Sequence, residues 1–159
     1  ANLYGSTGRT TEALSMFERA LELNRQVGRP TPLGATLGNM AVALGELGQW
    51  DRARELLTEA LRIHRETGHL RLQGGWHQML AWVAVRQGDP RGAVDDVEQA
   101  LRIHGQFDDR TNLGRTLLIR AEIEHAAGDA ARARATVAEA EALLGPGHPA
   151  VAPVRRLVE

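Results

Sequence analysis

Histidines and paired acidic residues are the side chains of this chain that could carry out chemistry. His64 and His69 are five residues apart, whereas a helix presents two metal-ligating histidines at positions i and i+4. Asp95-Asp96 and Asp108-Asp109 are neighbours in the chain, so neither pair converges from two elements as catalytic carboxylates do. The spacing therefore favours no catalytic residue, no metal site and no cofactor, and we expect a protein that is not an enzyme.

Glycine-rich segments and thiols offer no alternative chemistry. Gly74-Gly75 and Gly145-Pro146-Gly147 do not follow a strand and do not fit a phosphate-loop pattern. We expect both segments to be turns between helices. The chain contains no cysteine, which excludes disulfides, thiolate metal sites and cysteine nucleophiles.

Length and charge exclude further classes of function. The 159 residues fit one domain, and 19 basic against 20 acidic side chains give a formal net charge of -1. A basic excess, which nucleic-acid surfaces need, is missing. No apolar run approaches the roughly 20 residues of a membrane span. We therefore expect a cytoplasmic protein with no nucleic-acid contact and no membrane segment in this chain.

The strongest pattern in the sequence is an internal repeat of 40 residues. His64 and His104 share one column of the repeat, which favours a packing role over a metal-binding role. Small residues form the clearest columns: Gly8, Gly48, Gly88 and Gly128; Ala13, Ala53, Ala93 and Ala133; Ala20, Ala60, Ala100 and Ala140; and Ala1, Ala41, Ala81 and Ala121.

Each repeat is predicted to form two helices. Apolar residues at i, i+3, i+4 and i+7 predict a helix over 35–47, which Gly48 ends, and a second over 50–67, which Gly68 ends. Asp89-Pro90 and Asp129 provide helix caps, so the second helices of the next two repeats should begin there. No segment alternates with a period of two. The predicted fold class is all-α, a solenoid of antiparallel helix hairpins.

These columns resemble the tetratricopeptide repeat (TPR). The match consists of Leu37-x2-Met40-Ala41-x2-Leu44, then Gly48, then Ala53-x3-Leu57-x2-Ala60, against the TPR signature W-x2-L-G-x2-Y followed by A-x3-F. Tyr4 falls on the tyrosine column and Trp50 on the aromatic that opens the second helix. The resemblance covers the whole chain and implies a right-handed superhelix.

The repeat length departs from the usual TPR. A TPR unit has about 34 residues, whereas HEAT and armadillo units have about 40–47. The alanine and glycine columns nevertheless match TPR spacing, and the extra residues follow the second helix, which Val27-Gly28, Thr67-Gly68 and Phe107-Asp108 end. We therefore favour TPR over HEAT. Such repeats resemble those of kinesin light chains and of the C-terminal regions of actinobacterial transcriptional regulators and signal-transduction NTPases.

The register predicts one TPR array over residues 1–159. It comprises a truncated first repeat (1–33), three full repeats (34–73, 74–113 and 114–153) and the start of a capping helix (154–159), with Pro153 at its first position. Ala1 falls inside a helix of the first repeat. We therefore expect the chain to be part of a larger protein.

The TPR resemblance implies a concave groove lined by the first helix of each repeat. Asn39 falls where many TPR units carry an asparagine that holds this helix to its neighbour. The residues expected to contact a partner in the groove are Gly38, Val42, Glu46, Gln78, Trp82, Arg86, Arg115, Leu118, Glu122 and His125.

Trp82 is the most prominent of these residues, because tryptophan is enriched at interface hot spots. Packing against neighbouring hairpins is an equally good interpretation. Trp50 and Trp76 fall in columns that face other helices, so a structural role is expected for both. Arg86, Arg115 and Glu122 could bind charged groups of a peptide, although solvated surface charge also explains them.

Two functions are consistent with this reading. The first is a non-catalytic protein- or peptide-binding module, the interaction or sensor region of a larger bacterial regulator involved in transcription or signal transduction. The second is a scaffold that forms a homo-oligomer or docks its own upstream domain without a free peptide ligand. The lysine and asparagine clamp of TPR co-chaperones is absent, since the chain has no lysine.

Overall fold

The computed structural model describes residues 3–159, with side chains from residue 10 onward, and every regular element in that range is an α-helix. The prediction of an all-α fold is confirmed. The side chains of Ala1 and Tyr4 lie outside the described residues. The helices are α1 (Leu3–Val27), α2 (Pro30–Glu46), α3 (Trp50–Glu66), α4 (Leu70–Arg86), α5 (Val94–Gln106), α6 (Arg110–Ala126), α7 (Ala130–Leu144) and α8 (Val151–Val158).

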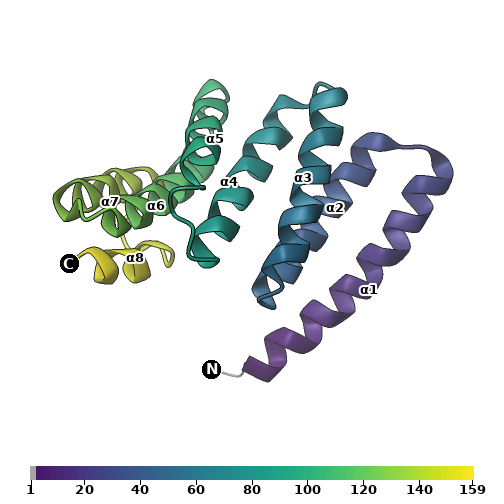
Figure 1. Ribbon diagram of the computed structural model, residues 1–159, viewed down its shortest axis with the longest axis horizontal. Coiled ribbons are helices and arrows are strands. Elements are labelled where there is room, and N and C mark those ends of the chain that lie inside the picture. The colour runs from purple at the N-terminus through teal and green to yellow at the C-terminus, as the bar shows by residue number, and fades with distance from the viewer. Residues whose placement is uncertain (1–2) are drawn as a thin grey trace. The chain divides into compact units, whose positions relative to one another are not determined.

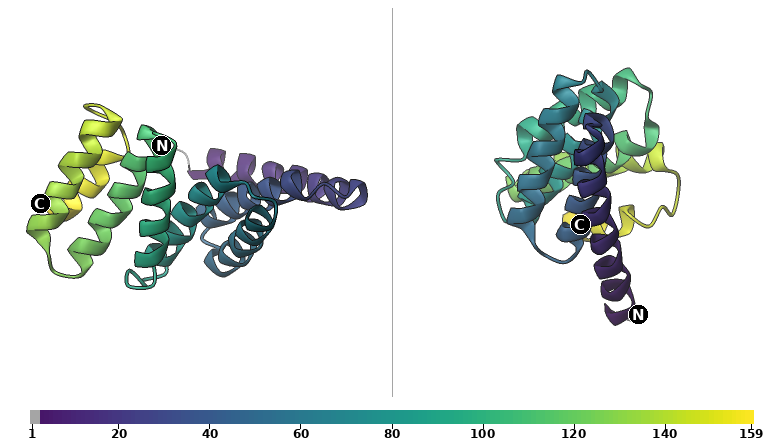
Figure 2. Two further views of the ribbon diagram at one scale, coloured as in Figure 1. Left: turned by 90° about the horizontal axis from the view of Figure 1, so that it is seen from above. Right: turned by 90° about the vertical axis from the view of Figure 1, so that its right-hand side faces the viewer.

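The helices divide into two compact units, Ala1–Trp76 and His77–Glu159, with the boundary inside α4. In the first unit α2 packs against both α1 and α3 (Figure 1). In the second unit α6 packs against α5, α7 and α8, and the left view of Figure 2 shows the yellow α8 beside the green helices. Each unit is therefore built around the first helix of one repeat.

The ends of the helices follow the predicted glycine columns. Gly48, Gly68, Gly88 and Gly128 all have positive φ, between 72° and 85°. After Gly68 the His69 N–H donates to the His64 carbonyl at 2.9 Å, the bond that closes a helix with a left-handed glycine. In the third repeat Asp108 takes this position with φ 50°, which aspartate tolerates better than most residues.

The expected turn at Gly74-Gly75 is wrong, because both glycines lie inside α4. The first helix of each repeat begins four residues earlier, at Pro30, Leu70 and Arg110. A Cβ at Gly34 would lie 2.9 Å from His64 Nε2, and one at Gly114 would lie 2.6 Å from Leu144 Cγ. These glycines lie in the interior of a helix, and because they carry no side chain, the next helix of the same repeat can pack closely against them.

One of the two expected starts of a second helix also differs. Residues 90–93 form turns and α5 begins at Val94, although the Gly92 N–H donates to Asp89 Oδ1 at 2.9 Å. The Asp89 carboxylate thus closes a tight turn before the helix. This turn requires glycine, because a Cβ at Gly92 would lie 2.1 Å from Asp89 Oδ2. Asp129 does cap α7 directly, accepting from the Arg132 N–H at 3.0 Å.

The first repeat does not form a hairpin. Helix α1 continues through Gly8, where the repeat pattern predicts a turn. The turn expected from the glycine column at Gly8 is therefore wrong, because α1 runs unbroken from Leu3 to Val27.

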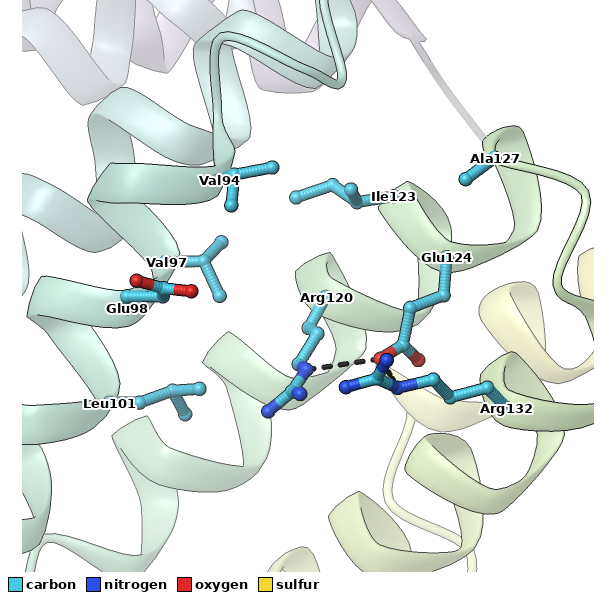
Figure 3. A pocket seen from close by; sticks show the side chains of 9 residues that line it. All are labelled: Val94, Val97, Glu98, Leu101, Arg120, Ile123, Glu124, Ala127 and Arg132. Carbon is cyan, nitrogen blue, oxygen red and sulfur yellow. Dashed lines mark hydrogen bonds and ion pairs between the residues drawn. The ribbon is translucent and has the colours of Figure 1, made fainter.

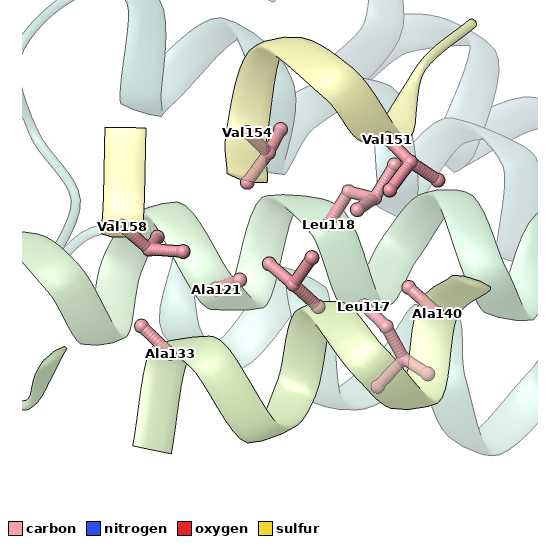
Figure 4. Close-up of a cluster of buried hydrophobic side chains, with 9 residues drawn as sticks. Leu117, Leu118, Ala121, Ala133, Ala140, Val151, Val154 and Val158 are labelled. Carbon is pink, nitrogen blue, oxygen red and sulfur yellow. The ribbon is translucent and has the colours of Figure 1, made fainter. Parts of the chain in front are cut away.

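The last helix covers the apolar edge of the fourth repeat, as predicted. Val151, Val154 and Val158 of α8 are buried and pack against Leu117, Leu118 and Ala121 of α6 (Figure 4). Helix α8 begins at Val151, two residues before the expected start at Pro153. The segment Gly145-Pro146-Gly147 forms the predicted turn before it, with positive φ at both glycines.

Two glycines within helices provide a matched test of this packing. A Cβ at Gly38 would lie 2.4 Å from Trp76 Cη2, whereas a Cβ at Gly75 would have nothing within 4 Å. We expect Gly38→Ala to lower the free energy of unfolding by about 1–3 kcal/mol through overpacking. Gly75→Ala should raise it by about 0.5–1 kcal/mol, because alanine is the better helix former. Urea denaturation followed by circular dichroism measures both, and equal effects would contradict the packing.

Candidate functional site

Three of the expected groove residues are buried in the packing between successive repeats. Gly38 lies against the Trp76 ring, and the Thr116 hydroxyl donates to Gln78 Oε1 at 3.3 Å. Leu118 is 4% exposed and belongs to the cluster covered by α8. The expectation that Gly38, Gln78 and Leu118 open onto a groove is therefore wrong, because the first helix of the following repeat covers this column.

Trp82, Arg86 and Glu122 form a partly exposed face between α4 and α6. Trp82 is half-buried and packs against the cluster of Ala81, Ala84, Ala93, Val97 and Ile119. Arg86 lies one turn further along α4, on the same face as Trp82, and its guanidinium forms an ion pair with the Glu122 carboxylate. Burial raises the pKa of Glu122, and Arg86 opposes that shift.

Arg115 and His125 lie on the same side of α6 as Glu122. Arg115 is exposed, and His125 is half-buried. The His125 Nδ1 atom is inaccessible to solvent and has no hydrogen-bond partner within the described part of the chain. The α4–α6 face, defined as Trp82, Arg86, Arg115, Glu122 and His125, therefore offers aromatic, cationic and anionic groups.

The remaining expected residues lie in the first unit. Val42 is half-buried and Glu46 is exposed, and both line a shallow cavity of about 370 Å³ between α1 and α2. Thr10, Ala13 and Phe17 form its α1 wall. Asn39, expected to hold α2 to its neighbour, is exposed and lines the same cavity.

Comparison with known protein families identifies the repeat. Models of the tetratricopeptide repeat match residues 1–66, 32–106 and 114–139. The chain belongs to the tetratricopeptide repeat family. No curated protein matches the chain.

Solved structures show the same TPR fold. BtubC (BKLC) from P. vanneervenii superposes with a TM-score of 0.77 at 18% identity, over 94% of this chain and 66% of that protein. A putative kinesin light chain from Podosopora anserina, described as having nearly identical TPR-like repeats, superposes with a TM-score of 0.73 at 20% identity, over 98% of this chain and 78% of that protein. At these identities the likeness establishes the fold alone. The predicted similarity to kinesin-light-chain TPRs is confirmed.

A cavity that the TPR pattern did not predict lies between α5, α6 and α7, with a volume of about 260 Å³. Its α6 wall contains Arg120, Ile123 and Glu124. Glu122 and Glu124 are two residues apart, which places them on opposite sides of a helix. The cavity therefore lies on the side of α6 away from the α4–α6 face.

His64 is part of a buried hydrogen-bond network in the first unit. The Trp76 indole N–H donates to His64 Nδ1 at 2.7 Å. Nδ1 is therefore the unprotonated nitrogen, and Nε2–H donates to the Thr31 carbonyl at 3.1 Å. The ring is fully buried. The structural roles predicted for His64 and Trp76 are confirmed.

A second buried histidine is paired with a carboxylate in the second unit. His77 Nδ1 lies 2.6 Å from Asp96 Oδ1, and its side chain is 7% exposed. The corresponding positions in the preceding TPR hold Leu37 and Leu56. A polar pair thus replaces an apolar pair within the same helix hairpin.

Within the described residues, no three histidine or acidic side chains are grouped so that they could hold a metal ion. None of the described helices combines the length and the apolar character needed to cross a membrane.

The buried His64 ring makes stability depend on pH. Burial lowers the pKa of His64, the hydrogen bond to Thr31 opposes the shift, and His69 adds to it. The unfolded chain binds a proton near pH 6.5, whereas the folded chain does so only at lower pH. We expect the first unit to lose stability as the pH falls below about 6.5, as measured by urea denaturation at pH 7.5 and 5.5.

His64→Leu should reduce this pH dependence, because leucine has no group that titrates. Leu144 occupies the same column in the fourth repeat, so leucine is a natural replacement at this position. His69→Gln, which changes an exposed ring, should largely retain it. NMR titration of the imidazole protons gives a direct reading. A titration midpoint for His64 at or above about 6.5, the ordinary value of a histidine, would contradict the assigned hydrogen bonds.

Proposed function

We propose that this chain is a protein-binding TPR module that captures a peptide segment on the α4–α6 face. The family is generally one of protein-interaction modules. The observation that supports this particular face is the Arg86–Glu122 ion pair beside the half-buried Trp82. Tryptophan and arginine are the side chains most often found at interface hot spots.

The partner expected at this face carries an apolar side chain flanked by a charged group. Trp82 provides the apolar contact area. Arg86 is 38% exposed and Glu122 13% exposed in their side chains, so an incoming anion reaches the guanidinium more easily than a cation reaches the carboxylate. An acidic residue next to an aliphatic or aromatic residue therefore fits the face best.

The wider role is that of an interaction or sensor region in a larger bacterial regulator of the cytoplasm, acting in transcription or signal transduction. Its support is the likeness of long, arginine- and alanine-rich TPRs to the C-terminal arrays of such regulators. A helix-turn-helix or a phosphate loop encoded upstream in the same reading frame tests this role. An upstream reading frame with neither pattern would contradict it.

Peptides selected from a random library on the immobilised protein test the proposed face. Trp82→Ala should weaken their binding by about 2 kcal/mol or more, the usual cost at a hot spot. Arg86→Glu should also weaken binding, because it replaces the cation that an acidic residue of the peptide would contact with a like charge. Fluorescence polarisation gives the affinities, and circular dichroism confirms that each variant remains helical.

A charge swap separates recognition from folding. Arg86→Glu combined with Glu122→Arg preserves an ion pair but reverses its polarity. Peptide binding should be lost in this double variant while the helices remain. Full binding by the swapped variant, or by helical Trp82→Ala, would refute the proposed face.

Self-association is a second candidate function, favoured by one observation. Met16, Leu23 and Val27 are 70%, 63% and 59% exposed on α1, and their spacing of seven and four residues places them along one side of the helix. Exposed apolar side chains grouped in this way are typical of interaction surfaces.

Met16→Glu combined with Leu23→Glu tests this alternative. If α1 mediates a homodimer, wild-type protein should show a mass that rises with concentration in light scattering, and the double variant should remain monomeric. Trp82→Ala serves as the matched control and should leave the dimer intact. A wild-type monomer at every concentration would exclude the scaffold.

A further inference from the structure

Glu124 is a buried carboxylate at a position that the other repeats fill with apolar residues. Its side chain is 10% exposed, and the residues 40 and 80 positions earlier are Ala84 and Leu44. Both of those residues are buried in the core. Burying a charge is costly unless it is paired, so Glu124 is not explained by the TPR pattern.

Three side chains compensate the charge of Glu124. Arg120 Nε and Arg132 Nε each lie 3.0 Å from Glu124 Oε1, and the Thr136 hydroxyl donates to Oε2 at 2.6 Å. The two arginines and one carboxylate leave a local charge of +1. Because both contacts are made through Nε, the outer guanidinium nitrogens can donate to a further acceptor.

The cationic group is specific to the fourth repeat. The residues 40 positions before Arg120 and Arg132 are Leu80 and Gly92. Arg120 and Arg132 are 38% and 59% exposed in their side chains, so solvent reaches both. Glu124 thus holds two like charges side by side at the surface, where neither would be fixed without it.

These arginines border the cavity between α5, α6 and α7. Figure 3 shows Val94, Val97 and Leu101 on the α5 side and Arg120, Glu124 and Arg132 on the other. Ile123 and Ala127 complete the apolar lining. Glu98 also lines the α5 side and is exposed, so the charges that line the whole cavity sum to zero, with both arginines on the wall opposite Glu98 (Figure 3).

We propose that this cavity binds a small aliphatic carboxylate. The apolar lining would take the aliphatic chain, and the Arg120 and Arg132 guanidiniums would bind the carboxylate, a group that arginine recognises with two parallel hydrogen bonds. The volume of about 260 Å³ is just below the range of about 300–1,000 Å³ typical of ligand pockets, so a small molecule fits better than a folded partner. This site is independent of the peptide-binding face.

Hexanoate is the probe, titrated into isotopically labelled protein and followed by NMR. Saturable shifts are expected at Val94, Val97, Ile123 and Ala127. Hexanol, hexylamine and acetate serve as matched probes that lack the charge, reverse it or lack the chain. Hexanoate should bind about tenfold more tightly than any of them, the effect of one charge-assisted contact.

A triple variant that removes the carboxylate and both arginines isolates the charged group, and at positions 120 and 124 it carries the residue types of the preceding repeat, those of Leu80 and Ala84. Arg120→Leu and Glu124→Ala, combined with Arg132→Ala, remove the buried charge together with its partners, so that no unpaired ion remains. This variant should stay helical, bind hexanoate about tenfold more weakly and bind hexanol unchanged. Arg110→Ala, an exposed arginine at the start of α6, should leave both affinities unchanged.

Filling the cavity tests the apolar half of the site. Val94 is 39% exposed at the first position of α5, so Val94→Trp can block the opening without entering the core, and it should abolish binding of hexanoate and hexanol alike. Glu98→Gln should leave hexanoate binding unchanged or make it tighter. The proposal is overturned by equal affinities for hexanoate and hexylamine, by weaker binding in Glu98→Gln, by shifts confined to the α4–α6 face, or by no saturable binding.

Discussion

The fold depends on helices that approach one another through side chains of almost no volume. In the second, third and fourth repeats the alanines of three columns are completely buried: Ala41, Ala81 and Ala121; Ala53, Ala93 and Ala133; and Ala60, Ala100 and Ala140. A methyl group at the contact brings two backbones close together, so larger side chains must interdigitate on either side. The recurrence of alanine every 40 residues therefore meets a steric requirement of the helix contacts. The columns that hold larger side chains can change their residue type from repeat to repeat.

That freedom explains where the individual character of each repeat resides. The pair formed by Leu37 and Leu56 becomes His77 and Asp96 in the next repeat. Likewise, Leu144 fills the column of His64, whose ring accepts a hydrogen bond from Trp76. Both histidines are buried and have hydrogen-bonding partners, as a polar group in a packed interior must. Departures from the repeat are thus sites where specific interactions replace nonspecific apolar packing.

The sequence was sufficient to predict the helices, their C-terminal glycines and the covering helix α8, because these depend on local spacing and on one repeated contact. It did not reveal the role of the Gly74 column, since a glycine that ends a helix and one that permits close approach look alike in a sequence. Gln78 and Leu118 were misplaced for a related reason. Their column is covered by the following repeat, which a projection of one helix does not represent. The signal for Glu124 was present, as a charge in a column of Leu44 and Ala84, but it stands out only when deviations from the repeat are examined as closely as matches.

Glu122 and Glu124 show how one helix can present two different charge environments. Glu122 forms an ion pair with one arginine, Arg86, and burial raises the pKa of its carboxyl group. Glu124 is bonded by two arginines and a threonine. Removing any one of these leaves a buried charge underpaired, which is strongly unfavourable. Glu124 therefore holds its two arginines in place, whereas Glu122, with a single arginine partner, is the carboxylate of the proposed peptide-binding face. Because successive positions on a helix point in different directions, two residues of separation suffice to assign these roles to opposite sides of α6.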